Sequence, residues 1–248
     1  LAQLPLTHPL GFPARIALAE GQRVLGARAA ARQVLQSIPE AQLSLAQKFV
    51  LRAELIRLAL AEQRVEQIDA VISQGRQIDG QTSPLLDVAI LEGLVEKWRR
   101  LQDRPAAERA ACESQIRELI EALRQSGDAY WTLRGELLVA RSIARFGSQS
   151  DGGMQTYAAE MAYRRGQLDE AVAGFLRAET AAIQSGDQTK AFQLGMAAAA
   201  IEHSRNRDAE AFQLFNRLSQ THREQSQAAR AGELAVFHAG QLFKANPG

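Results

Sequence analysis

The sequence RGQLDEA at residues 165–171 returns in related form as RNRDAEA at residues 205–211. Each copy is followed, four residues after its last alanine, by a phenylalanine: Phe175 in the first copy and Phe215 in the second. A helical pattern that recurs after about 40 residues is typical of stacked helical hairpins. The repeat therefore predicts the architecture of the chain, although it identifies neither a reaction nor a partner.

The composition favours an all-α protein. Hydrophobic residues make up 46% of the 248 residues, enough to bury a sizeable core, and only seven prolines interrupt the helix-forming residues. The formal net charge of +1 lacks the strong basic field of nucleic-acid-binding proteins, so we expect no nucleic-acid partner. No apolar run reaches the roughly 18 residues of a membrane-spanning helix, and we expect no transmembrane segment.

Two features bear on the origin of the chain. Arginine accounts for 25 of the 29 basic residues, a bias typical of GC-rich bacterial genomes. The chain begins with Leu1 rather than methionine, so we expect it to be part of a larger bacterial protein or to have lost N-terminal residues. These features leave both the bacterial cytoplasm and the periplasm open, and they predict no oligomeric state.

Turn residues and apolar periodicity divide the chain into about eleven expected helices. Three prolines predict an extended lead-in over residues 1–13, and a single repeat domain is expected over residues 14–248. The helices are expected over residues 14–38, with a break near Gly21, and over 41–61, 65–77, 85–101, 106–124, 128–146, 154–165, 168–185, 188–204, 208–222 and 226–244.

The tetrapeptide QSGD occurs twice, at residues 125–128 and 184–187. Its glycine can adopt the left-handed conformation that ends a helix, and its aspartate can cap the helix that follows. Both copies are therefore predicted to join two helices. Between residues 127 and 153 the regular spacing is lost, which predicts an irregular joint in the array.

The set Gly166, Ala171, Phe175 and Ala178 resembles the tetratricopeptide repeat. In that family, small residues let the two helices of a hairpin approach, an aromatic residue fills the gap, and a glycine occupies the turn. The resemblance covers residues 153–218. It implies an α–α superhelix of antiparallel hairpins, a divergent tetratricopeptide-like solenoid whose period exceeds the family's usual ~34 residues. An irregular helical bundle is the alternative.

The resemblance also implies a binding surface, because the first helix of each hairpin lines a concave groove in that family. The corresponding positions in this sequence are Thr156, Glu160, Tyr163, Arg164, Met196, Ala200, His203, Phe237, Gln241 and Lys244. They lack the set of side chains with which some members clamp a peptide's terminal carboxylate. We therefore expect a basic or amphipathic segment near Glu160, Tyr163 and His203; a solvated face without a ligand is the alternative.

Residue patterns of common catalytic and metal sites are missing. The four histidines are scattered without the spacing of a zinc site. The single cysteine, Cys112, lies on an apolar helical stripe and is expected in the core, as are Trp98, Tyr130 and Trp131. We expect no enzymatic activity, no metal and no cofactor.

These patterns favour a non-enzymatic scaffold that binds a peptide or helix on its concave surface. Stacked hairpins present the long curved surface that such partners need. The main alternative is a sensor or regulatory arm that binds a small ligand or relays a signal to an effector domain. A closed apolar pocket with convergent polar groups would favour that alternative. A third, weaker hypothesis is an all-helical enzyme whose carboxylates converge between helices.

Overall fold

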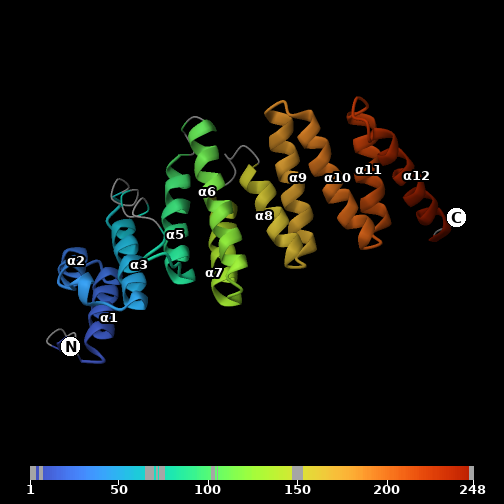
Figure 1. Cartoon of the computed structure of the whole chain (residues 1–248). Coiled ribbons are helices and arrows are strands. Elements are labelled where there is room, and N and C mark those ends of the chain that lie inside the picture. Colours follow the sequence, from blue (N-terminus) through green and yellow to red (C-terminus); the bar gives the residue numbers. More distant parts are fainter. Residues whose placement is uncertain are drawn as a thin grey trace. The chain divides into compact units, whose positions relative to one another are not determined.

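The computed structural model describes residues 4–5, 8–64, 70, 72, 76–101, 104, 106–146 and 153–245. Within these ranges it contains eleven α-helices, one short 3₁₀ helix over Glu40–Gln42, and no strand beyond an isolated bridge between Ile78 and Gln81. The all-α class is confirmed (Figure 1). The helix expected over 65–77 falls mostly outside the described residues.

The chain divides into two compact units, Leu1–Leu138 (unit 1) and Val139–Gly248 (unit 2). The division falls within residues 127–153, where the sequence loses its regular spacing. A single repeat domain over residues 14–248 stays a prediction.

Unit 1 is built from neighbouring helices that pack in sequence order. Its helices are α1 (Gly11–Val24), α2 (Arg28–Gln36), α3 (Leu45–Ala61), α5 (Pro84–Arg100), α6 (Ala106–Gln125) and the first part of α7 (Ala129–Phe146). Helix α3 packs against α1, α2 and α5, and α5 also packs against α6. Trp98 and Cys112 are buried between α5 and α6, as predicted. The Trp98 indole donates a hydrogen bond of 3.1 Å to the buried carboxylate of Glu113.

The N-terminal helices differ from the prediction in two places. Helix α1 begins at Gly11, so Pro13 lies in its first turn rather than in an extended lead-in. Proline is tolerated there because the first N–H groups of a helix have no acceptor within the helix. The helix also continues through Gly21 and ends before Gly26, whose φ of 82° terminates it.

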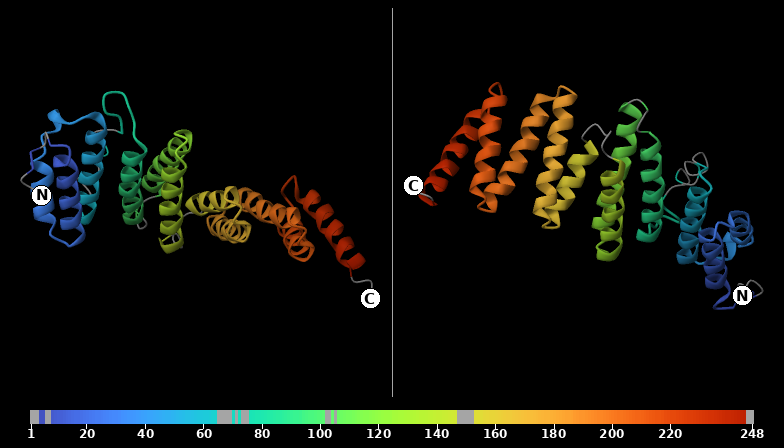
Figure 2. Two further views of the ribbon diagram at one scale, coloured as in Figure 1. Left: turned by 90° about the horizontal axis from the view of Figure 1, so that it is seen from below. Right: turned by 180° about the vertical axis from the view of Figure 1, so that it is seen from behind.

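Unit 2 is a run of antiparallel neighbours joined by short turns (Figures 1 and 2). Its helices are the last part of α7, α8 (Gly153–Arg164), α9 (Leu168–Gln184), α10 (Gln188–Ser204), α11 (Asp208–Thr221) and α12 (Ala228–Ala245). Each helix from α8 to α12 packs against the next. The bounds of α8 to α12 lie within two residues of those predicted. This consecutive packing is that of an α-solenoid.

The turns explain why the hairpins repeat. Gly166 and Asn206 occupy the same position in the two successive repeats. Both adopt left-handed conformations, with φ of 73° and 55°. Asparagine tolerates this region better than most residues that carry a side chain, so the turn survives the loss of glycine. In the two QSGD segments, Asp128 and Asp187 accept hydrogen bonds of 3.1 and 3.0 Å from backbone N–H groups of the following helix, which confirms both predicted caps.

The core of unit 2 repeats with the turns. Phe175 and Phe215 are both buried, and each packs among small buried residues that include Ala171 in the first repeat and Ala211 in the second. The two sequence repeats are therefore equivalent in their packing as well as in their sequence.

Candidate functional site

The predicted binding positions all lie in unit 2, on α8, α10 and α12. On α8, Glu160, Tyr163 and Arg164 are exposed, with 52% of Tyr163 accessible. On α10, His203 is exposed, whereas Met196 is half-buried and packs against the core around Phe215. On α12, Phe237 is 49% exposed and Gln241 is half-buried.

The structure brings two of them together, His203 and Phe237. Their ring centroids are 6.2 Å apart and the rings meet edge to face. Among the contacts of the described residues, none joins Tyr163 to this pair. The predicted surface thus has a defined aromatic centre on α10 and α12, with the α8 side chains as a separate group.

A chain of hydrogen bonds that starts at a carboxylate fixes His203. Asp208 Oδ1, at the start of α11, lies 2.7 Å from Nδ1 of His238 on α12. Nε2 of His238 in turn lies 2.9 Å from Nδ1 of His203 on α10. His238 is only 1% exposed and stacks on Phe215 at a centroid distance of 6.0 Å. One exposed imidazole is therefore held by a buried imidazole and a carboxylate from two other helices.

The carboxylate determines how the protons are arranged in this chain. An ionised Asp208 only accepts, so Nδ1 of His238 donates to it. Nε2 of a neutral His238 then accepts from Nδ1 of His203, which leaves Nε2 of His203 as an acceptor facing away from the chain. The arrangement fixes the orientation of the His203 ring.

Sequence reasoning missed His238 and Asp208 as parts of this site. His203 and His238 are 35 residues apart, so their spacing suggested no connection. The available signal was the position of His238 on an apolar stripe with Ala231 and Ala235, where a polar residue needs a partner.

Ion pairs link the start of α9 to the turn between α10 and α11. Asp169, at the start of α9, lies 2.8 Å from Nη1 of Arg205 and 2.8 Å from Nη1 of Arg207. Hydrogen bonds from Arg205 and then Arg207 hold the pKa of Asp169 below its ordinary value. These contacts connect the start of α9 to the turn that follows α10.

A separate cavity of about 290 Å³ lies among the last part of α7, α8 and α9. Its lining consists of Ala140, Ile143, Ala144, Gln155, Ala158, Ala159, Glu170, Gly174 and Arg177. Most of these side chains are small and apolar, and three are polar. The cavity is close to the lower limit, roughly 300 Å³, of typical small-molecule sites.

Two negative findings apply to the described part of the chain. It holds no group of three or more His, Cys, Asp or Glu side chains placed to bind a metal ion. None of its helices is both long enough and apolar enough to cross a membrane.

Comparison with known proteins adds no relative: no protein-family model matches the chain, and no curated protein matches it either. The residues and their packing therefore carry the functional argument.

Proposed function

We propose that unit 2 is a non-enzymatic protein-interaction module of divergent tetratricopeptide type, which binds a peptide or a helix across α8, α10 and α12. The observation that carries the proposal is the exposure of aromatic side chains at the predicted groove positions. Tyr163 and Phe237 are half exposed, whereas Phe175 and Phe215 are buried in the cores of the same unit. Exposed aromatic residues of this kind are enriched at sites of protein association.

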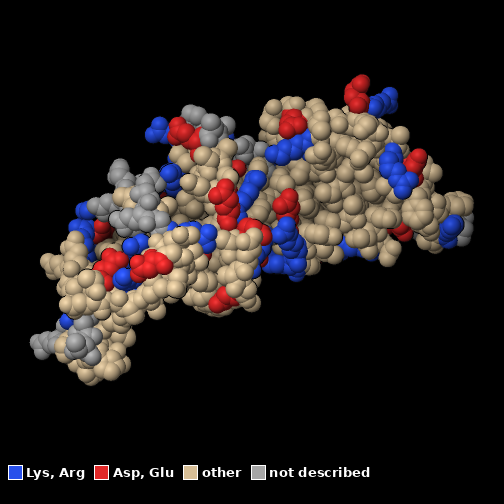
Figure 3. All heavy atoms as spheres, viewed as in Figure 1, with Lys and Arg blue, Asp and Glu red and all other residues tan. Residues whose placement is uncertain are grey.

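The charge distribution around α10 supports the same reading. In the space-filling view, the face over α10 and its neighbours α9 and α11 carries few charged side chains, and those present lie toward its edges (Figure 3). On α12, Val236 and Phe243 are also largely exposed. Apolar and aromatic groups with few charges suit a protein surface better than a polyanion.

The chemistry of the surface favours a basic or amphipathic partner segment. Glu160 offers an exposed carboxylate one helical turn before Tyr163 and Arg164. His203, held by His238, offers a fixed hydrogen-bonding edge beside Phe237. A segment with one apolar side and one or two basic residues would satisfy both groups.

Site-specific photo-crosslinking tests this proposal. A photoreactive phenylalanine analogue at position 163 or 237 should crosslink to a partner in cells of the native organism. The same analogue at Ile183, an exposed residue of α9 outside the proposed surface, serves as the control. We expect the double variant Tyr163→Ala, His203→Ala to lose the partners that the wild type captures. Equal recovery of the same partners by both proteins would show that the proposed surface is wrong.

The cavity beside α8 favours a second candidate, a sensor of small apolar ligands. Filling it with Ala158→Phe should abolish any ligand-induced rise in melting temperature, whereas Tyr163→Ala should leave that rise unchanged. A panel of small aromatic probes that includes indole supplies the ligands. If none of them stabilises the wild type, the sensor hypothesis loses its support.

A further inference from the structure

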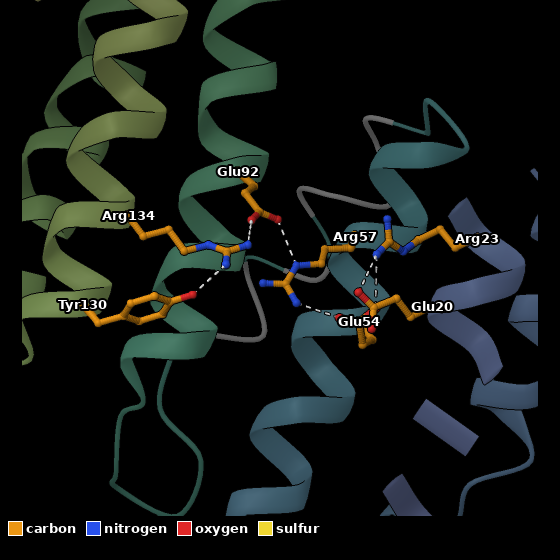
Figure 4. Close-up of polar contacts among 7 residues, drawn as sticks. All are labelled: Glu20, Arg23, Glu54, Arg57, Glu92, Tyr130 and Arg134. Atoms are coloured by element: carbon orange, nitrogen blue, oxygen red, sulfur yellow. Dashed lines mark hydrogen bonds and ion pairs between the residues drawn. The ribbon is translucent and has the colours of Figure 1, made fainter. Parts of the chain in front are cut away.

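A second cavity, in unit 1, has a charged lining drawn from four helices. Its volume is about 390 Å³, within the range of small-molecule sites. The charged residues that line it are Glu20 and Arg23 of α1, Arg57 of α3, Glu92 of α5 and Arg134 of α7 (Figure 4). Leu60 and Ala61 of α3 complete the lining with apolar surface.

Arg57 anchors this cluster. Its Nε donates a hydrogen bond of 3.1 Å to Glu92 Oε2, and its Nη1 donates one of 2.6 Å to Glu54 Oε1. Glu54 is buried behind the cavity. Burial opposes the charge on Arg57, but the carboxylates of Glu92 and Glu54 outweigh it and raise the pKa of Arg57 above its ordinary value. Arg57 is therefore a fixed cation whose bonds hold α3 to α5.

The other charged pairs of the cluster lie beyond hydrogen-bonding distance. Nη2 of Arg23 is 3.7 Å from Glu54 Oε2 and 4.0 Å from Glu20 Oε1, and Nη2 of Arg134 is 3.9 Å from Glu92 Oε1. Nε of Arg23 is buried and has no hydrogen-bond partner among the described residues. Charged groups of both signs thus line the cavity, and these pairs leave part of their hydrogen-bonding capacity unused, as in a site completed by a bound molecule.

Arg134 is held in place from its own helix. Its Nη1 donates a hydrogen bond of 3.2 Å to the Tyr130 hydroxyl, and its guanidinium lies 5.6 Å from the centroid of the Trp131 ring. Tyr130 is 61% exposed, which corrects the expectation that it belongs to the core. These contacts limit the rotamers of Arg134, and such pre-organisation reduces the entropy lost on binding a ligand.

We propose that this cavity binds a zwitterionic α-amino acid with an apolar side chain. Its carboxylate binds the guanidinium groups of Arg23 and Arg134, and its ammonium group binds Glu20 and Glu92. Counted with Glu54, the cluster has three cationic and three anionic side chains, so a ligand without net charge keeps the cluster neutral. Leu60 and Ala61 provide the contact for the apolar side chain. The site is independent of the surface proposed for unit 2.

Isothermal titration calorimetry with three matched probes tests the zwitterion. L-leucine carries both charges, 4-methylpentanoate lacks the ammonium group, and 3-methylbutylamine lacks the carboxylate. We expect L-leucine to bind and each half-probe to bind at least about ten-fold more weakly, because each loses its charge-assisted hydrogen bonds. No binding of L-leucine, or equal binding of 4-methylpentanoate, would overturn the proposal.

Substitutions of the charged residues that line the cavity test which of them contacts each charged group of L-leucine. Arg134→Gln and Arg23→Gln should each weaken L-leucine by about ten-fold or more, while Glu20→Gln should weaken L-leucine and leave 4-methylpentanoate unchanged. Arg28→Gln, on the exposed side of α2, is the matched control and should change neither. Arg134 is 47% exposed, so its variant should fold normally, and thermal denaturation checks this. Wild-type affinity in Arg134→Gln, or an equal loss in Arg28→Gln, would refute the assignment.

Discussion

At the scale of single residues, Gly195 shows how closely the helices of unit 2 approach one another. A Cβ atom at this position would lie 2.6 Å from Leu218 Cδ2 and 2.9 Å from Glu179 Oε1. Glu179 on α9 receives two hydrogen bonds, of 2.7 and 2.8 Å, from Arg217 on α11. The absence of a side chain on α10 thus leaves room for a link between the helices on either side of it.

The variant Gly195→Ala should therefore destabilise the protein by about 1–3 kcal/mol, because the added methyl group forces Leu218 or the buried ion pair to move. The free energy of unfolding in urea measures the effect. Gly240→Ala is the matched control on α12, where an added Cβ meets nothing within 4 Å. It should be neutral or more stable by up to about 1 kcal/mol. A similar effect of both substitutions would contradict the close packing at Gly195.

The two repeat turns allow an opposite pair of substitutions. Asn206→Gly should raise the free energy of unfolding by up to about 1 kcal/mol, because glycine enters the left-handed region without steric cost. Gly166→Ala should lower it by about 1 kcal/mol for the same reason. Urea denaturation of both variants checks the sign. A loss of stability in Asn206→Gly would mean that the asparagine side chain contributes more than its backbone conformation costs.

At the scale of elements, the last turn of α5 shows how charges respond to pH. Glu96 accepts hydrogen bonds of 2.8 and 2.5 Å from Arg99 and one of 2.9 Å from Arg100. The bonds from Arg99, together with those from Arg100, outweigh burial and lower the pKa of Glu96 below its ordinary value of 4.5. The unfolded chain therefore binds more protons at this site as the pH falls below that value.

The stability that Glu96 contributes should be present above its ordinary pKa and lost as the pH falls through the lower pKa of the folded protein. Glu96→Gln should thus be less stable than the wild type at neutral pH, by about 0.5 kcal/mol for such exposed pairs, and the difference should vanish in acid. Urea titrations across this range measure both proteins. Glu160→Gln, which removes a carboxylate without an ion pair among the described residues, is the control substitution. A difference for Glu96→Gln that persists in acid would exclude the ion pairs as its source.

Helices were predictable wherever local signals agree. The helix expected over 188–204 is found at Gln188–Ser204, because a capping aspartate precedes it and a left-handed residue follows it. The first break was misplaced at Gly21, since a glycine inside a helix costs only about 1 kcal/mol and packing compensates for it. The exposure of Tyr130 and the link from Asp208 through His238 to His203 depend on neighbouring helices that the local sequence does not identify.

At the scale of the whole molecule, the unfolding of unit 1 can be followed apart from that of the whole chain. Both tryptophans, Trp98 and Trp131, lie in unit 1. Their fluorescence therefore reports on unit 1, while far-ultraviolet circular dichroism reports on the helices of both units. The comparison of these two signals can show whether the units unfold independently.

The variant Phe215→Ala should destabilise unit 2 by about 3–5 kcal/mol, because Phe215 is fully buried. If the units unfold independently, its dichroism transition should split, with the early part absent from the tryptophan signal. Leu123→Ala, in the core of unit 1, should instead shift the fluorescence transition. An equal shift of both signals in Phe215→Ala would show that the two units unfold as one.

The link between Glu179 and Arg217 also bears on how such a chain grows. Arg177 occupies in the first repeat the place that Arg217 occupies in the second, because each lies two residues after the phenylalanine of its repeat. In a tandem duplication of residues 168–207, the first Glu179 would meet the second Arg177 in place of Arg217. The copied segment already contains both the glutamate and the arginine that form the ion pair between neighbouring repeats. A duplication of this segment would therefore keep this ion pair between successive repeats.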